Sequence, residues 1–207
     1  MMTTKKLDLK REMKEFWLPP REPVLVKVPP FYFLMVDGQG DPNTAQAYQD
    51  ALQALYGVSY TLKFMLKKSA RGVDYSVAPL EGLWWADNME LFSAEDKGQW
   101  LWTAMIMQPR PVSEALIHKA MEEVAEKKEL PALSKVRFEC YDEGLSAQIM
   151  HIGPYAAEKP TIDRLHAFIE SNGYRRRGKH HEIYLGDPRR ADPAKLKTVI
   201  RQPVERA

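Results

Sequence analysis

The chain contains two similar runs of predicted strands and helices, and this internal repetition limits its possible folds more than any other feature. The first run reads FLMVDGQGDP, a helical segment, VAPLEGLWW and WLWTAMIMQP. The second reads SAQIMHIGPY, a helical segment, GKHHEIYL and LKTVIRQP, so both runs end in Gln-Pro. One repeat of this length rarely buries its own apolar face, so the copies are expected to share a core. The sequence therefore predicts one domain over residues 21–207, with repeats at about 21–110 and 135–204 joined by a helix, after a lead-in at residues 1–20.

The composition is that of an ordinary globular protein and disfavours several functional classes. The chain has 207 residues, of which 44% are hydrophobic and 28% charged, which is enough for a sizeable core. The formal net charge of +2 disfavours a dedicated nucleic-acid binder, which carries a strongly basic face. One cysteine, Cys140, excludes an internal disulfide framework and fits a reducing compartment. No signal peptide or membrane-spanning stretch is evident, so we expect a cytoplasmic protein.

Apolar periodicity and turn residues together predict an α+β fold with an antiparallel sheet. Alternating or continuous apolar residues predict strands at 24–28, 32–36, 75–85, 99–107, 136–142, 145–152, 180–185 and 196–201. Apolar residues at three- and four-residue spacing predict helices at 43–67, 113–128 and 160–171. Asp41 or Asn43 is expected to cap the first helix and Ser113 the second, and a polar loop with Asp87 and Asn88 is expected to join two strands. We expect the helices to cover one face of the sheet and leave the other open or concave for a ligand.

Each repeat carries one glutamate among large side chains in the middle of a predicted strand. Strand alternation places Glu81 on one face with Trp85, and Glu182 on one face with His180 and Tyr184. Carboxylates are seldom buried unless they are paired or used, so each glutamate is a candidate functional group. Glu182 is the stronger candidate, because its polar neighbours can orient a water for which it serves as general base, or it holds a cationic ligand. As alternatives to a functional role, Glu182 faces solvent or pairs with an arginine. The two glutamates either face each other across a cleft, or only one of them has kept a function.

Four of the five tryptophans lie close together in the chain, at Trp84, Trp85, Trp100 and Trp102. Aromatic residues in strands usually belong to the core, where each ring buries roughly 150–250 Å². Adjacent strand residues point to opposite faces, so Trp84 and Trp85 cannot both lie beneath the helices. At least one is therefore expected to line the open face, where it suits a flat, hydrophobic or cationic organic molecule.

The remaining polar motifs indicate no metal or cofactor. Tyr155 follows a predicted strand in HIGPY, and it either donates its hydroxyl to a ligand oxygen that develops negative charge or packs the loop. The five histidines lack zinc-binding spacing, and Gly38-Gln39-Gly40 is too short for a dinucleotide fingerprint. The arginines at 175–177 and 189–190 are interpreted as solvated charge rather than as a phosphate site. We therefore expect no cofactor and no metal ion.

The sequence resembles the GyrI-like small-molecule-binding domain family over nearly its whole length, from Val24 to Val204. The resemblance rests on the duplicated unit, the HIGPY turn and the strand GKHHEIYL. The combination of PLEGLWW, IMQP, VRFE, IMHIGPY, GKHHEIYL and DPRR is similar to that of the family's stand-alone members. The resemblance implies two fused strand-helix-strand-strand units that form a concave antiparallel sheet around a central ligand pocket.

The resemblance also implies a class of ligand and a class of reaction. Multidrug-responsive regulators of the family place a glutamate in the pocket for cationic drugs, and the matching position in the EIY strand is Glu182. Those regulators carry a DNA-binding helix-turn-helix before the module, whereas here residues 1–20 precede it, so direct DNA binding is not expected. Some stand-alone relatives hydrolyse cyclopropanoid cyclopentenone toxins, which alkylate DNA, by opening the three-membered ring with water.

By this resemblance we expect a hydrolase for xenobiotic detoxification that acts on reactive, flat cyclopropanoid cyclopentenones. Glu182 is expected to activate the water, and Tyr155 to stabilise the oxygen that becomes phenolic. The residues expected to bind the ligand are Trp84, Trp85, Trp100, Trp102, Tyr184, His180 and Glu81. The expected partners are flat aromatic or cationic small molecules, without a membrane.

Two other interpretations predict many of the same features. A non-catalytic multidrug-binding module, acting as sensor or sequestering protein, needs the same glutamate and aromatic side chains but binds only a stoichiometric amount of ligand. A protein that binds a protein partner, as a gyrase inhibitor does, needs the tryptophans as an exposed interface patch. Turnover distinguishes a hydrolase from the non-catalytic binding module. Surface substitutions identify the protein that binds a protein partner, because they would then matter more than a substitution of Glu182.

Overall fold

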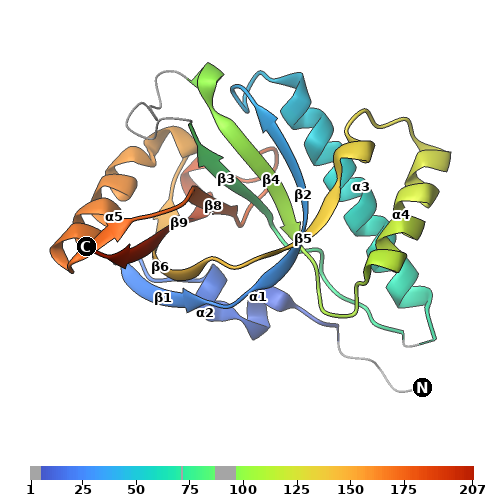
Figure 1. The fold of residues 1–207 in the computed structure, drawn as a ribbon, viewed down its shortest axis with the longest axis horizontal. Helices are drawn as coiled ribbons and strands as arrows, with labels where there is room; N and C mark the ends of the chain where they lie inside the picture. The colour runs from blue at the N-terminus through green and yellow to red at the C-terminus, as the bar shows by residue number, and fades with distance from the viewer. Residues whose placement is uncertain (1–5, 71, 87–96) are drawn as a thin grey trace. The chain divides into compact units, whose positions relative to one another are not determined.

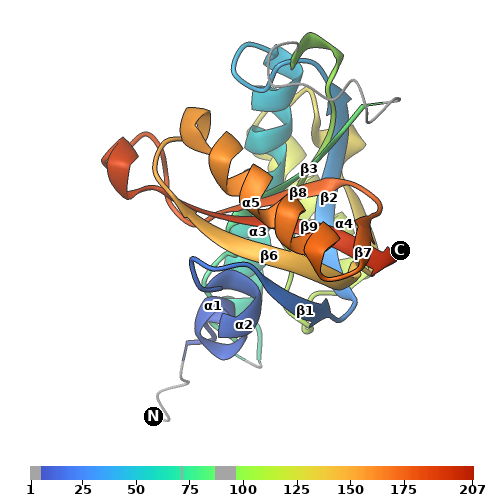
Figure 2. The same ribbon diagram turned by 90° about the vertical axis from the view of Figure 1, so that its left-hand side faces the viewer.

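The computed structural model describes residues 6–70, 72–86 and 97–207 (Figures 1 and 2). The strands and helices in these residues confirm the α+β class, and the strand pairs with a described register are antiparallel. The chain divides into two units: the first contains residues 1–12, 31–78 and 85–141, and the second contains residues 13–30, 79–84 and 142–207. Within the described ranges, every helix is too short or too polar to span a membrane.

The first unit has a three-stranded antiparallel sheet with β2 in the middle, and two long helices. Its strands are β2 (Phe31–Gln39), β4 (Leu101–Met107) and β5 (Arg137–Tyr141). Helix α3 (Gln46–Lys68) packs on β2 and β4, and α4 (Glu114–Lys127) packs on α3, as Figure 1 shows. The apolar stripe predicted for α3 from its periodicity is the buried face of this helix, which explains why Gly57 does not interrupt it. The short helix α1 (Leu9–Glu12) belongs to the same unit.

The second unit has a five-stranded antiparallel sheet. In spatial order its strands are β1 (Val24–Val28), β6 (Gly144–Ile152), β9 (Lys197–Arg206), β8 (His180–Tyr184) and β3 (Leu80–Trp85), whose last residue, Trp85, is counted with the first unit. The short strand β7 (Tyr174–Arg176) pairs with the end of β9. Helix α5 (Lys159–Ser171) lies against this sheet (Figure 2). Its Leu165 and Ile169 share one buried core with the strand residues Ala147, Ile149, Ile200 and Val204.

The division into units does not follow the division into sequence repeats. Strand β1 of the first repeat pairs with β6 of the second, and β3 pairs with β8. Conversely, β5 of the second repeat pairs with β2 of the first. Each unit therefore contains strands from both repeats.

The segment predicted as a lead-in contributes to the second unit. Helix α2 (Lys14–Trp17) buries Phe16 and Trp17, and it packs on β1. Two polar side chains of the sheet hold its backbone carbonyls: Arg201 donates to the oxygen of Phe16, and Gln148 donates to that of Glu15 at 2.6 Å. A cation at the carbonyl end of a helix also interacts favourably with the helix dipole.

Several predicted boundaries are wrong for local reasons. Helix α3 begins at Gln46, after Ala45, and no side chain caps it. Asp41 instead accepts a hydrogen bond from the backbone N–H of Asn43 at 2.9 Å, which makes a turn before the helix rather than its cap. The strand predicted from residue 75 begins only at Leu80, because residues 75–79 pair with no strand except through an isolated bridge from Tyr75 to residue 7.

The other expectations about helix ends are confirmed where the structure describes them. Ser113 caps α4, and its hydroxyl oxygen accepts from the backbone N–H of Leu116 at 3.4 Å. Glu123 and Lys127 form an ion pair along the same helix, at the i,i+4 spacing that favours such pairs. The polar loop predicted around Asp87 and Asn88 lies outside the described residues.

Candidate functional site

The pairing of β3 with β8 brings together the polar and aromatic residues of the candidate site within the second unit. Gly82 lies opposite Glu182, and Trp84 lies opposite His180. Tyr184 shares their face, because alternate residues of a strand point the same way, as predicted from the sequence. The ring of a loop residue joins them, and we call the five side chains the Glu182 cluster: Trp84, Tyr155, His180, Glu182 and Tyr184.

A chain of hydrogen bonds ends on the carboxylate of Glu182. The indole N–H of Trp84 donates to the hydroxyl of Tyr184 at 3.1 Å, and this hydroxyl donates to Glu182 Oε2 at 2.7 Å. His180 Nε2 lies 3.0 Å from Glu182 Oε1 and must carry the hydrogen, because a carboxylate oxygen only accepts. The Glu182 side chain is 13% exposed. Donors on both oxygens fix the orientation of a carboxylate that solvent still reaches.

Tyr155 approaches the cluster from the loop between β6 and α5. It begins a short 3₁₀ helix, Tyr155–Ala157, directly after Pro154. Its ring centroid lies 5.4 Å from that of Tyr184 with an interplanar angle of 68°, an edge-to-face arrangement that aromatic pairs favour. Tyr155 is 36% exposed, so it lies at the solvent side of the cluster. This placement puts a second phenol next to the side chain that hydrogen-bonds Glu182.

Gly82 makes the position of Trp84 possible. A Cβ atom at residue 82 would lie 2.7 Å from Trp84 Nε1 and 2.9 Å from two further ring atoms. The buried indole therefore covers the glycine that lies opposite Glu182, and from there it reaches Tyr184. In the motif PLEGLWW, the glycine therefore shapes the site together with the glutamate and the tryptophans.

Gly82→Ala is expected to lower the free energy of unfolding by about 1–3 kcal/mol, because the new methyl group displaces the Trp84 ring. The displacement also breaks the hydrogen bond from Trp84 to Tyr184. Urea unfolding and tryptophan fluorescence measure the two effects. Gly186→Ala is the matched control, because its Cβ would lie 3.5 Å from the Leu196 side chain, an ordinary contact. Equal stability losses in both variants would contradict the packing role of Gly82.

Glu81 lies on the other face of the sheet from Glu182, and this corrects its predicted place in the ligand site. It pairs with Ile183, one residue beyond Glu182, so the pleat turns the two carboxylates apart. Glu81 is 2% exposed, and its Oε2 lies 3.0 Å from His181 Nε2. The arrangement in which the two glutamates face each other across a cleft is therefore excluded.

Glu81 belongs to a set of four buried charged side chains. His181 Nδ1 lies 2.9 Å from Glu143 Oε1, and Arg201 donates to Glu143 Oε2 at 3.0 Å. We call Glu81, Glu143, His181 and Arg201 the buried quartet. Two carboxylates face an imidazole and a guanidinium, so the charges compensate one another away from solvent.

The quartet shifts the pKa values of its members strongly. Burial alone would lower the pKa of His181, but the two carboxylates outweigh it, Glu143 more than Glu81, and raise the pKa to about 9. Burial would raise the pKa of Glu143, but His181 and Arg201 lower it to about 2. His181 is therefore a cation at neutral pH, bonded through both ring nitrogens. The sequence analysis missed Glu143 and Arg201, because they are separated by 58 positions in the chain.

Of the four clustered tryptophans, Trp84 is the one that the described hydrogen bonds connect to the Glu182 cluster. Trp102 is a buried core residue of the first unit, where its ring lies over Gly38 and meets Tyr48 edge-on at 5.0 Å. This burial contradicts its expected role in ligand binding, because the aromatic-core alternative applies to it. Trp85 is half-buried. The Lys97 ammonium lies over the Trp100 ring, 5.1 Å from its centroid. Both also belong to the first unit.

The arginines at 175–177 contact partners within the second unit. Arg175 pairs with Glu205 at 2.9 Å, and Arg177 donates to backbone carbonyls, including that of Val204 at 3.3 Å. Arg176 lies 3.2 Å from His166 Nδ1. Burial, together with the charge of Arg176, lowers the pKa of His166 to about 4, so this imidazole is neutral near pH 7.

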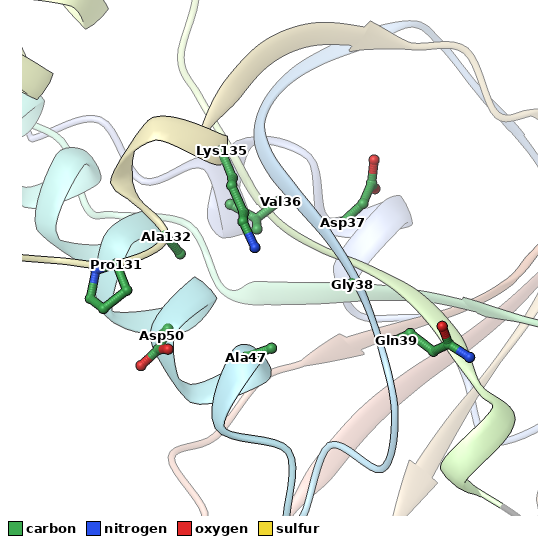
Figure 3. A pocket seen from close by; sticks show the side chains of 9 residues that line it. All are labelled: Val36, Asp37, Gly38, Gln39, Ala47, Asp50, Pro131, Ala132 and Lys135. Atoms are coloured by element: carbon green, nitrogen blue, oxygen red, sulfur yellow. The ribbon is translucent and has the colours of Figure 1, made fainter.

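A cavity of about 290 Å³ in the first unit has a different character from the Glu182 cluster. Its wall contains β2 residues, the start of α3 and the segment before β5, and its charged lining residues are Asp37, Asp50 and Lys135 (Figure 3). None of its lining residues is aromatic, and none was predicted to bind the ligand. The cavity therefore does not match the flat organic ligand expected from the sequence.

The comparisons with known proteins agree with the fold and with the predicted family. The GyrI-like small molecule binding domain matches residues 21–205. An uncharacterized conserved protein from Listeria innocua is 41% identical, with a TM-score of 0.90 over 97% of this chain and 100% of its own. A hydrolase from Listeria innocua is also 41% identical, with a TM-score of 0.87 over the same shares of the two chains.

A more distant structure shares the fold alone. The C-terminal domain of EcmrR is 14% identical, with a TM-score of 0.56 over 90% of this chain and 98% of its own. No curated protein matches the sequence significantly. The family match spans both repeats and includes every member of the Glu182 cluster. The chain therefore belongs to the GyrI-like small-molecule-binding domain family.

Proposed function

We propose that the protein hydrolyses reactive, flat xenobiotics of the cyclopropanoid cyclopentenone type, with Glu182 as general base. The observation that carries the proposal is the Glu182 carboxylate, which is 13% exposed and held by Tyr184 and His180 beside aromatic rings. The 41% identity to a hydrolase from Listeria innocua supports a hydrolytic activity. The membership of a small-molecule-binding family supports an organic ligand.

The proposed reaction adds one water to the strained ring. As the water oxygen attacks the ring methylene, Glu182 accepts a proton from it. A carbon–carbon bond of the cyclopropane breaks, and its electron pair moves into the conjugated ring and makes the former carbonyl oxygen a phenolate. The hydroxyl of Tyr155 stabilises that oxygen, which then takes up a proton equivalent to the one held by Glu182. The product contains the substrate plus one water.

In the proposed mechanism, Tyr184 has a role beyond the ligand binding expected from the sequence. Its hydroxyl donates to Glu182 and accepts from Trp84, so it orients the base in addition to offering a ring surface. A positioned general base contributes about 10²–10⁴-fold to a rate. Orientation of the substrate adds to this, and a strained ring that is already electrophilic needs little further activation.

A non-catalytic binding module is the second candidate function. The anionic Glu182 beside the rings of Tyr155 and Tyr184 is chemically suited to a flat cation. The protein-partner interpretation has less support, because Trp84 and Trp102 are buried rather than exposed as an interface patch.

Incubation of the protein with a large molar excess of a cyclopropanoid cyclopentenone separates the two candidates. A hydrolase forms many equivalents of the hydrated product, which mass spectrometry counts against protein concentration. Saturable binding with no hydrated product would contradict the hydrolase and support the binding module. Heat-denatured protein measures the spontaneous hydration to be subtracted.

A further inference from the structure

We infer that His151 is a positioning residue, which holds the loop that carries Tyr155 against the Glu182 cluster; this inference rests on the proposed function. His151 is the penultimate residue of β6, and it is 5% exposed. It is the first residue of the motif HIGPY, which ends with Tyr155. Within the described part of the chain, its ring makes two polar contacts, and neither is to Glu182.

The imidazole connects three segments of the second unit. Its Nε2 lies 3.3 Å from the backbone carbonyl oxygen of Pro154, and its Nδ1 lies 2.9 Å from the hydroxyl of Thr161 in the first turn of α5. A carbonyl oxygen only accepts, so Nε2 carries a hydrogen, and in the neutral ring Nδ1 accepts from the threonine hydroxyl. We call His151, Pro154 and Thr161 the His151 bracket.

The backbone at Gly153 leaves space for the His151 ring and is itself anchored by a hydrogen bond. Gly153 has a φ of +143°, and a Cβ there would lie 3.2 Å from His151 Nε2. A residue with a side chain is therefore disfavoured both by the backbone conformation and by the imidazole. The N–H of Gly153 donates to the carbonyl of Leu196 at 3.0 Å, which anchors the loop to the chain before β9.

The bracket acts on Tyr155 through the peptide that precedes it. The Pro154 carbonyl that receives the His151 hydrogen bond also accepts from the backbone N–H of Ala157 at 2.8 Å. Fixing this carbonyl fixes the peptide plane between Pro154 and Tyr155, and hence the direction in which the tyrosine leaves the backbone. The ring of Tyr155 then meets Tyr184, which hydrogen-bonds Glu182. His151 thus acts through Tyr155, without touching the reacting groups.

His151→Phe tests the inference, because phenylalanine keeps a ring of similar size but makes neither hydrogen bond. We expect turnover of a cyclopropanoid cyclopentenone to fall about tenfold, as for the loss of positioning hydrogen bonds. The amide hydrogens of Ala157 and Glu158, which bond to carbonyls of this loop, are expected to exchange faster with solvent. His118→Phe, at an exposed position on α4, is the matched control and is expected to change neither quantity.

A double-mutant cycle with Tyr155→Phe distinguishes positioning from general damage to the fold. If His151 acts through Tyr155, His151→Phe lowers turnover in the wild type but causes little further loss when Tyr155 is already phenylalanine. An equal loss in both backgrounds, or unchanged exchange at Ala157 and Glu158, would overturn the inference. Thr161→Val removes only one of the two contacts, so a smaller effect in the same direction is expected if His151→Phe does not fold.

The cycle separates failure of this inference from failure of the proposed function. If the wild type shows no turnover, the proposed hydrolysis is wrong, and the same four proteins are compared by their affinity for ethidium, a flat aromatic cation. Weaker binding of His151→Phe that disappears in the Tyr155→Phe background supports the positioning role for a binding module. Equal weakening in both backgrounds contradicts it.

Discussion

Glu143→Gln is expected to lower the free energy of unfolding by about 3–5 kcal/mol, because it removes one charge from a buried, charge-compensated set. Glu143 accepts from His181 at 2.9 Å and from Arg201 at 3.0 Å. In the variant, the buried guanidinium loses its carboxylate partner and His181 loses one of its two carboxylate partners. An amide satisfies the geometry in part, but it does not supply the negative charge that compensates two buried cations.

Urea unfolding at neutral pH measures this loss, and Glu205→Gln is the matched control. Glu205 pairs with Arg175 at the surface, where both side chains are largely exposed, so its loss is expected to change the stability by less than about 1 kcal/mol. Similar losses for Glu143→Gln and Glu205→Gln would show that the quartet contributes no more than a surface ion pair.

The same quartet predicts how stability depends on pH. The folded pKa of His181, about 9, is above its ordinary value of 6.5, so its contribution is complete below pH 6.5 and is lost as the pH rises through 9. The folded pKa of Glu143, about 2, is below its ordinary value of 4.5, so its contribution is complete above pH 4.5 and is lost as the pH falls through 2. Both contributions are complete between pH 4.5 and 6.5. In Glu143→Gln, the pH dependence is expected to weaken at both ends.

Glu182→Gln is expected to lower turnover by about 10²–10⁴-fold while the fold is retained, because an amide has the size of the carboxylate but does not take a proton from water. The side-chain oxygen of the variant still accepts one hydrogen bond, from Tyr184 or from His180, so the local structure needs little change. Binding of a neutral flat compound is expected to be largely unchanged, whereas a cationic compound is expected to bind more weakly.

Steady-state kinetics and equilibrium binding together measure these effects. Glu170→Gln, at an exposed position on α5 in the same unit, controls for the loss of one negative charge. Full turnover in Glu182→Gln would remove this carboxylate from the mechanism. Loss of turnover in both variants would indicate a long-range charge effect rather than a general base.

The local parts of the site could be predicted from the sequence because strand geometry has a strict period of two residues. This period places His180 and Glu182 on one face of the strand and His181 on the other. The hydrogen bonds agree, because His180 contacts Glu182 whereas His181 contacts Glu143. The same period places Glu81 and Gly82 on opposite faces. The pairing of β3 with β8 by register, which places Gly82 rather than Glu81 opposite Glu182, could not be read from either strand by itself.

The parts that could not be predicted depend on contacts between distant segments. Glu143 lies in a turn and Arg201 in the last strand, and neither carries a local signal of burial; only the fold brings them to His181. The pairing of β1 with β6 and of β5 with β2, each between the two repeats, also cannot be read from the periodicity of those strands. Trp102 was assigned to the ligand site because tryptophans cluster in the sequence, but its place over Gly38 makes it core.

The origin of the oxygen atom in the product tests the central claim, that Glu182 directs water onto a strained electrophile. Wild type and Glu182→Gln are incubated with excess cyclopropanoid cyclopentenone in water labelled with oxygen-18. Mass spectrometry then measures the masses of the product and of the protein. We expect many equivalents of product bearing one labelled oxygen from the wild type, few from the variant, and no compound attached to either protein. Product formation that stops at one equivalent, with the compound bonded to the protein, would contradict this claim.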